Sequence, residues 1–361
     1  MIVMLYFIFT TGACNLKCKY CGGSFPEELV PWTVKYSLTD LSRFLEKDKG
    51  EIIVAFYGGE PLLNTNFIRK AMTKLPADRF IIQTNGTLVK KLEWKFWLKF
   101  DSILLSIDGR KEITDYYRGR GVYSLVIKAA RWLREIGFNG DLIARMTVSE
   151  KSDISLEVSH LVSLNLFDHI HWQLDVIWSN SWKNFDNWAN FSYKPGIRKL
   201  IDIWISRLKD NEVIGLVPFL GVLKSMIDSP LPSPPCESGR TSFAILTNGK
   251  ILACPIAVDT KWAYLGDVWS KTPDELKDSI IIKEPCTSCQ IFASCGGRCL
   301  YAYKERLWGN EGFRKICELT RHLVNQLKLK LPIIKKLLKR NPTLKNSLIY
   351  PKYNNTTEII P

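Results

Sequence analysis

Two hydrophobic periods alternate along the first half of the chain. Short continuous apolar runs, typical of buried parallel strands, recur six times, and stretches with the three-to-four-residue period of amphipathic helices separate them. The predicted strands are residues 2–10, 52–57, 80–83, 102–106, 142–148 and 169–176. The predicted helices between them are residues 37–47, 67–75, 89–99, 124–136 and 154–164. This alternation predicts an α/β fold with right-handed βαβ units and a parallel sheet.

The number of units is smaller than the eight of a closed barrel, so the pattern predicts an open or partial barrel. In such sheets, ligands bind at the carboxyl ends of the strands. Polar motifs stand at these ends: Tyr57-Gly58-Gly59-Glu60-Pro61, Thr84-Asn85-Gly86 and Ser106-Ile107-Asp108-Gly109, with Arg145 inside the fifth strand. Each motif alone is compatible with ordinary turn chemistry, because glycine and asparagine favour turns. Their recurrence at successive strand ends predicts one shared ligand.

A proline-rich segment, residues 229–235, is incompatible with a helix or a central strand and predicts a domain boundary. We expect a barrel over residues 1–228, a small second domain over residues 229–317 and a basic helical tail over residues 318–361.

The tail carries Leu319, Leu323 and Leu327 at every fourth position, and Pro332 is expected to divide it into two helices. A membrane-surface helix has this pattern too, but we expect the stripe to pack on the protein itself.

The segment of residues 177–192 is rich in aromatic side chains, which stand among Asn and Ser: Trp178, Trp182, Phe185, Trp188 and Phe191. Two interpretations remain open. The segment is either a loop packed by its own aromatic rings or a lid that contacts a substrate above the barrel mouth.

The composition is that of an ordinary globular protein, with 361 residues, 46% hydrophobic and 24% charged, which is a length typical of two to three domains. No apolar run reaches the ~20 residues of a transmembrane helix. No basic residue precedes the apolar start, so we expect a cytoplasmic protein without a signal peptide. The net charge is +14, and residues 318–361 contribute half of it with nine Lys or Arg against two Glu. Because such a run is usually a solvated face, nucleic-acid binding is not expected.

The ten cysteines fall in groups, with none between residues 22 and 235. In a chain without a secretion signal, such grouping indicates metal or iron–sulfur ligands and not disulfides. The first group, Cys14-x3-Cys18-x2-Cys21, directly follows the first predicted strand. A structural zinc site takes four ligands. Three thiolates instead suit a 4Fe–4S cluster with one iron left open, and Tyr20 places an aromatic ring beside it.

These motifs, in this order along the chain, resemble the radical S-adenosylmethionine (SAM) superfamily. The resemblance implies a partial (β/α)6 barrel in which SAM chelates the open iron of the Cys14, Cys18 and Cys21 cluster. On reduction, SAM is cleaved to a 5′-deoxyadenosyl radical that abstracts hydrogen from a substrate. The SAM-binding residues implied by the resemblance are Tyr20 at the adenine, Gly58, Gly59 and Glu60 at the methionine ammonium, Ser106 and Arg145 at the carboxylate and ribose, and Thr84, Asn85 and Asp108 in the same site.

The seven remaining cysteines would, on their spacing alone, form a zinc-ribbon-like or ferredoxin-like metal module. The spacing also resembles the SPASM domain, an auxiliary iron–sulfur domain of peptide-modifying radical SAM enzymes. That resemblance implies two further 4Fe–4S clusters, and so three in all. The distal cluster would use Cys286, Cys289, Cys295 and Cys317. The nearer cluster would use Cys236, Cys254 and Cys299, because residues 222–235 contain no further cysteine.

The three-ligand cluster would keep an open iron for a substrate thiolate, or would take a ligand other than cysteine, such as an oxygen, in a structural role. Pro255 stands where sulfatase maturases that resemble this chain have a catalytic aspartate. The chain begins directly at the first strand, without the leader-peptide-binding domain of many relatives, so we expect peptide recognition to use another surface or a separate peptide-recognition protein.

The resemblance implies a radical SAM oxidoreductase that oxidises or cross-links a side chain of a peptide or protein. A one-electron donor such as ferredoxin or flavodoxin is its expected partner. Two alternatives remain: a radical dehydrogenase of a small molecule, and a zinc-dependent nucleic-acid-binding protein, which would explain the charge and the cysteines but not the open three-cysteine loop.

Overall fold

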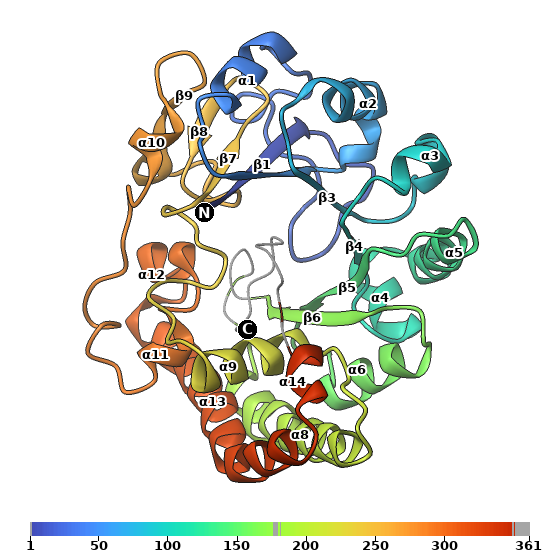
Figure 1. The fold of residues 1–361 in the computed structure, drawn as a ribbon, viewed down its shortest axis with the longest axis vertical. Helices are drawn as coiled ribbons and strands as arrows, with labels where there is room; N and C mark the ends of the chain where they lie inside the picture. Colours follow the sequence, from blue (N-terminus) through green and yellow to red (C-terminus); the bar gives the residue numbers. More distant parts are fainter. Residues whose placement is uncertain (1, 176–179, 181, 349, 351–361) are drawn as a thin grey trace.

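A computed structural model describes residues 2–175, 180, 182–348 and 350. Its centre is one nine-stranded sheet in the order β6-β5-β4-β3-β2-β1-β7-β8-β9 (Figure 1). The first six strands are parallel neighbours in chain order, as βαβ units require. They are β1 (Val3–Thr11), β2 (Glu51–Gly58), β3 (Arg79–Thr84), β4 (Ser102–Ser106), β5 (Asp141–Val148) and β6 (His169–Leu174). The six predicted strands are therefore confirmed, except that Val176 lies outside the described residues.

Helices lie on the outside of this curved sheet (Figure 1). Four confirm the predicted amphipathic stretches: α1 (Leu38–Leu45), α2 (Thr65–Lys74), α5 (Val122–Glu135) and α6 (Ile154–Ser163). The predicted helix over residues 89–99 is wrong, since a 3-10 turn, η2 (Val89–Lys91), and a short helix, α3 (Trp94–Trp97), replace it. The buried Trp97 indole N–H donates to the carbonyls of Val89 and Leu92, so these carbonyls do not continue a helix. Helix α4 (Lys111–Arg118) was not predicted.

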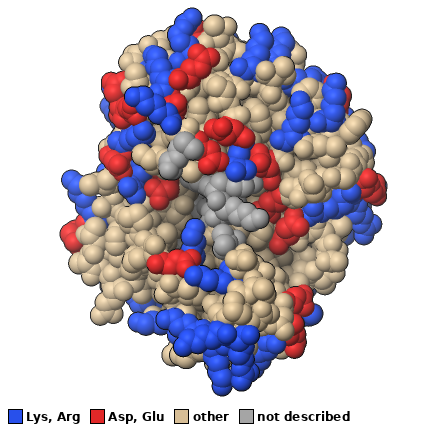
Figure 2. Space-filling model, in the orientation of Figure 1, with Lys and Arg blue, Asp and Glu red and all other residues tan. Residues whose placement is uncertain are grey.

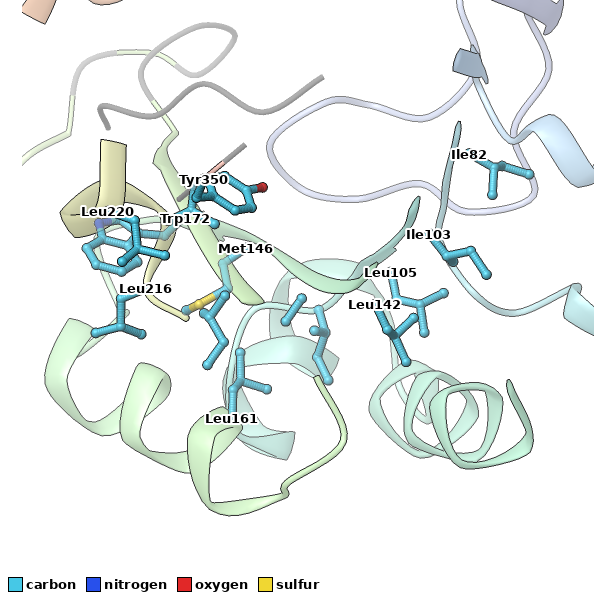
Figure 3. Packing of buried hydrophobic residues seen from close by; sticks show 14 of the residues in the cluster. Ile82, Ile103, Leu105, Leu142, Met146, Leu161, Trp172, Leu216, Leu220 and Tyr350 are labelled. Carbon is cyan, nitrogen blue, oxygen red and sulfur yellow. The ribbon is translucent and has the colours of Figure 1, made fainter. Parts of the chain in front are cut away.

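The two faces of the sheet carry separate apolar clusters, as the twofold period of a strand dictates. On β1, the side chains of Met4, Tyr6 and Ile8 point to the helices and belong to the larger apolar cluster. Figure 3 shows other members of this cluster. Leu5, Phe7 and Phe9 point to the concave side. There they pack in a second apolar cluster with side chains from the cysteine-rich C-terminal region. The C-terminal residues of this cluster are Ala244, Leu246, Leu252, Cys254, Ala257, Ala263, Cys299 and Tyr301. The C-terminal region therefore covers the inner face of the barrel.

The chain returns to the sheet after the proline-rich segment. Strand β7 (Ser242–Ile245) pairs in parallel with β1, and β8 (Lys250–Leu252) and β9 (Tyr264–Asp267) continue the sheet antiparallel. The predicted boundary at residue 229 falls before β7, so the chain on both sides of it contributes to one sheet.

The tail is built on α13 (Gly309–Arg340), which packs against α8 (Lys194–Lys209) and α9 (Val217–Ile227) before the short α14 (Thr343–Ser347). The expected break at Pro332 is wrong, because buried side chains on both sides of the proline, Leu327 and Ile334, hold one helix against the protein. The apolar stripe packs internally, as predicted. Lys and Arg gather on the outer side at this end of the molecule (Figure 2). Within the described ranges, no helix is long and apolar enough to cross a membrane.

Four shorter helices complete the described fold: α7 (Phe185–Trp188), α10 (Pro273–Leu276), α11 (Phe292–Cys295) and α12 (Leu300–Glu305). Two further 3-10 turns, η1 (Pro61–Asn64) and η4 (Lys261–Ala263), and one π-helical turn, η3 (Ala189–Tyr193), are also present.

Candidate functional site

The first cysteine group lies in a loop that leaves the carboxyl end of β1. The Cys14 amide donates to Ser24 Oγ at 2.9 Å, and the Gly22 amide donates to the Cys18 carbonyl at 2.9 Å. All three thiols, Cys14, Cys18 and Cys21, line one cavity of about 620 Å³. The loop therefore folds so that its thiols face a common space.

The Gly58-Gly59-Glu60 motif is bound along the backbone that leads into this loop. The amides of Gly59 and Glu60 donate to the carbonyls of Thr11 and Ala13 at 3.1 and 2.9 Å. Gly58 has a φ of 131°, and a Cβ on either glycine would approach a carbonyl oxygen of residues 11–13 to within 2.3 Å. Only glycine permits this approach, and it brings Glu60 beside the cysteine loop.

Glu60 is a buried carboxylate on the cavity wall, held by three donors. Thr84 Oγ1 donates to it at 2.6 Å, the Asn85 amide at 2.7 Å and the Leu62 amide at 3.1 Å. Burial raises the pKa of Glu60 to about 7, although these donors oppose the shift. A ligand ammonium is the group that would favour its ionised form most strongly.

Ser106 and Arg145 are register neighbours on β4 and β5, and both line the cavity. The Arg145 guanidinium hydrogen-bonds to His171 Nδ1 and to Gln173 Oε1 on β6. Burial and the charge of Arg145 lower the pKa of His171 well below its usual range, so the imidazole is a neutral acceptor. Two neutral acceptors orient the Arg145 guanidinium on the cavity wall, and a guanidinium there suits binding of an anionic ligand group.

Asp108 is fully buried and is not among the residues that line the cavity. Its carboxylate accepts from Tyr20 Oη at 2.9 Å, from the Thr147 amide at 2.9 Å and from Arg118 at 2.8 and 2.9 Å. The Arg118 guanidinium also lies 5.5 Å from the Tyr20 ring centroid. Direct contact between Asp108 and SAM remains a prediction, and the contacts observed here make Asp108 the support that holds the Tyr20 ring at the cavity.

Replacing Asp108 with Asn is expected to destabilise the protein by about 3–5 kcal/mol, because it leaves the Arg118 guanidinium buried without its counter-charge. Urea unfolding under anaerobic conditions measures this loss. Glu212→Gln is the matched control, since the Arg207–Glu212 pair is about half exposed and is expected to contribute less than about 1 kcal/mol. Equal losses for the two variants would contradict a structural role of the buried pair.

The same cavity reaches the second cysteine region. Cys236, Cys254 and Pro255 line it together with the first cysteine loop. Cys299, the third predicted ligand of the nearer cluster, is buried and lies outside this lining, but it shares an apolar cluster with Cys254 and Tyr301. Cys236 and Cys254 therefore share a cavity wall with most of the predicted SAM-binding residues, whereas Cys299 lines the second cavity.

The four cysteines predicted for the distal cluster, Cys286, Cys289, Cys295 and Cys317, line a second cavity of about 230 Å³, and Cys299 lies on its wall. Burial raises the pKa of Cys295 to about 12, and the positive charge of Arg298 opposes this shift. Burial also raises the pKa of Cys286 to about 11. Thiols that converge on one enclosed space with a nearby cation are the donor set that an anionic iron–sulfur cluster needs, so these residues fit the predicted cluster.

Within the described residues, no disulfide joins any two of the ten cysteines. In the part of the chain that the structure describes, no three His, Cys, Asp or Glu side chains are arranged to hold a single metal ion. The thiols line two cavities instead.

The aromatic segment is a packed element, which agrees with the first of the two interpretations for the rings described. The rings of Trp182 and Trp188 lie 4.8 Å apart, and the ring of Phe185 lies 5.5 Å from that of Trp308 at the start of α13. None of the four described aromatic residues of the segment lines the large cavity, and Phe191 is 79% exposed. Trp178 lies outside the described residues.

The cavity wall also contains residues that were not predicted from the sequence, among them Arg118, Gln173 and Asp175. Ser149 Oγ donates to Asp175 Oδ2 at 2.6 Å. Gln173 and Asp175 occupy alternate positions at the end of the sixth strand, so inspection of that strand end would have found them. Arg118 ends a helix that was not predicted, and no sequence signal pointed to it.

Comparison with known proteins agrees with this geometry. Residues 8–153 match the Radical SAM superfamily. The cysteine-type anaerobic sulfatase-maturating enzyme of Clostridium perfringens is 25% identical over 336 residues, which cover 80% of this chain and 86% of that protein. The mycofactocin maturase of Mycolicibacterium smegmatis is 24% identical over 319 residues, which cover 81% of this chain and 76% of that protein.

Two solved structures share the fold. The native structure of anSMEcpe with bound AdoMet superposes with a TM-score of 0.73 at 19% identity and covers 93% of this chain and 99% of its own. Streptococcus suis SuiB bound to the precursor peptide SuiA has a TM-score of 0.58 at 17% identity, over 83% of this chain and 72% of its own. At these identities, the two structures support the fold alone. Given the ordered motifs, the strand-end geometry and the family match, residues 8–153 form a radical SAM domain.

Proposed function

We propose that this radical SAM enzyme oxidises or cross-links a side chain of a peptide or protein. Two kinds of relatives support this proposal through their names, the sulfatase-maturating enzymes and a mycofactocin maturase. A third support is SuiB, whose solved structure holds a precursor peptide. Ferredoxin or flavodoxin remains the proposed electron donor, and a separate recognition protein remains the proposed carrier of the peptide.

The observation that carries the proposal is the large cavity shared by two cysteine groups. Its wall includes Cys14, Cys254, Glu60 and Arg145. A bound cluster with SAM would supply radical chemistry at this place. The chain's own residues would hold the SAM methionine between a carboxylate and a guanidinium, and would exclude water.

The SPASM assignment of the C-terminal region and its two auxiliary clusters belong to this proposal. Support comes from the convergence of four cysteines on the 230 Å³ cavity and of Cys236 and Cys254 on the larger one. Pro255 lines the larger cavity beside Cys254 and cannot accept a proton. The proposed reaction therefore differs from sulfatase maturation in its proton acceptor.

A direct test uses short peptides encoded beside the gene. Each peptide is incubated anaerobically with reconstituted enzyme, SAM and dithionite. The expected product has lost two hydrogens, with formation of 5′-deoxyadenosine in matching amount. Unchanged peptides, together with oxidation of a small molecule under the same conditions, would favour the dehydrogenase alternative.

Reconstitution is expected to give about twelve irons per chain, because three cysteine groups would each hold one four-iron cluster. Iron and sulfide analysis after anaerobic reconstitution measures this. A matched variant with Ala at Cys286, Cys289, Cys295 and Cys317 is expected to retain about eight. A wild-type value near four would contradict both auxiliary clusters.

The nearer auxiliary cluster is expected to respond to a thiol, since only three cysteines are available to it and soft sulfur ligands prefer iron. The experiment uses electron paramagnetic resonance of a variant with Ala at Cys14, Cys18 and Cys21, which isolates the auxiliary signals. A small thiol should perturb one signal, whereas the corresponding alcohol should not. If the thiol changes neither signal, the cluster is completed by an oxygen ligand and has a structural or electron-transfer role.

A further inference from the structure

Arg298 is a buried cation on the wall of the cavity that holds the four distal cysteines. Its side chain is 6% exposed, and its Nε is buried and donates no hydrogen bond within the described part of the chain. Three arginines line this cavity, namely Arg298, Arg314 and Arg321, and no Asp, Glu, Lys or His lines it. The cavity is therefore strongly electropositive for its size.

The other two arginines differ from Arg298 in their contact with solvent. Arg314 and Arg321 lie on α13 with exposed side chains, so water and salt screen their charges. Arg298 is enclosed, and its charge acts on Cys295 and Cys317. A charge in such a low-dielectric position acts on its neighbours much more strongly than an exposed one.

The backbone at Arg298 adds an independent observation. Gly296, Gly297 and Arg298 have φ values of 60°, 84° and 60°, so three consecutive residues are in the left-handed region. Glycine adopts this conformation freely, whereas a side chain brings its Cβ close to a backbone carbonyl. A glycine would satisfy the turn at position 298, yet an arginine stands there and directs its charge to the thiols.

We infer that Arg298 raises the reduction potential of the distal cluster and so sets how readily that cluster accepts an electron. The inference rests on the distal cluster of the proposed function. Uptake of one electron makes the cluster more negative by one charge and oxidises the donor by one electron, and no bond forms or breaks. A buried guanidinium beside the cluster stabilises the more negative state, because hydrogen bonding and charge around the sulfurs tune such potentials.

The test is a redox titration followed by electron paramagnetic resonance. The parent carries Ala at Cys14, Cys18 and Cys21, so that the auxiliary clusters alone give signals. The distal signal is the one lost when Cys286→Ala and Cys289→Ala are added. A parent without such a signal would overturn the proposed distal cluster, and this inference with it. A parent with the signal isolates the role of Arg298.

In that parent, Arg298→Gln is expected to weaken electron uptake at least tenfold, which is about 59 mV for a one-electron couple. Arg298→Lys keeps the charge and is expected to recover most of the potential. Arg321→Gln is the matched control, because it removes an exposed arginine from the same cavity, and a much smaller shift is expected. Equal shifts for the Arg298 and Arg321 variants would overturn the inference.

A second neutral variant protects the test against misfolding. Arg298→Gly suits the left-handed backbone and removes the charge, so it is expected to lower the potential as Arg298→Gln does. If both neutral variants lose the iron of the distal cluster while Arg298→Lys keeps it, the charge serves cluster binding, and its assignment to the potential is wrong.

Discussion

Replacing Cys14, Cys18 and Cys21 together with Ala is expected to abolish the formation of 5′-deoxyadenosine from SAM. These thiols line the same cavity as Glu60 and Arg145, and the four distal cysteines line a separate one. Without the three thiolates, no iron would be held beside the predicted SAM site. The measurement is chromatography of anaerobic reactions with dithionite and SAM.

The same variant is expected to lose about a third of its iron, since two of three four-iron clusters would remain. The control carries Ala at Cys286, Cys289, Cys295 and Cys317, which is expected to lose a similar share of iron but to retain SAM cleavage. Substantial 5′-deoxyadenosine from the first variant would show that the active cluster has been assigned to the wrong cysteines.

Glu60→Gln and Arg145→Gln are each expected to weaken SAM binding at least about 30-fold, because loss of one partner from a buried charge pair costs about 2 kcal/mol or more. Glu60 is the buried carboxylate on the wall of the large cavity, and Arg145 faces the same cavity from β5. Equilibrium dialysis of SAM against anaerobically reconstituted protein measures the effect.

The iron content of both variants is expected to stay near normal, since neither residue is a predicted ligand. Arg69→Gln and Glu93→Gln are matched controls, because this ion pair has the same charges but lies partly exposed outside the cavity. Affinities unchanged from wild type in both Glu60 and Arg145 variants would mean that SAM binds elsewhere in the cavity.

Much of the site could be predicted because it depends on short spans of sequence. A three-cysteine loop with spacings of two and three residues has to present its thiols to a common space. Parallel strands in chain order bring their carboxyl ends to one edge, which is why motifs at residues 58–60, 84–85 and 106 meet around Glu60 and Ser106. Hydrophobic period alone was enough to find all six barrel strands.

Other features depended on contacts between distant parts of the chain. SAM binding by Asp108 stays a prediction from its motif, but only the fold shows that its buried carboxylate pairs with Arg118, on a helix with no clear sequence signal. The electropositive cavity of the distal cysteines likewise forms only in the folded chain. There α13 brings Cys317, Arg314 and Arg321 to the turn that holds Arg298.

Local signals also failed where tertiary packing opposed them. Pro332 was expected to end a helix, but packing of Leu327 and Ile334 against the protein outweighs one missing backbone hydrogen bond. The rings of the aromatic segment pack on each other and on Trp308, more than 100 residues away in sequence, and not over the cavity. Motif spacing thus determined which thiols and strand-end motifs gather at the candidate site, because thiols and turns act over a few residues. The tertiary structure decided which charges support that chemistry, because burial and ion pairing arise only when distant segments meet.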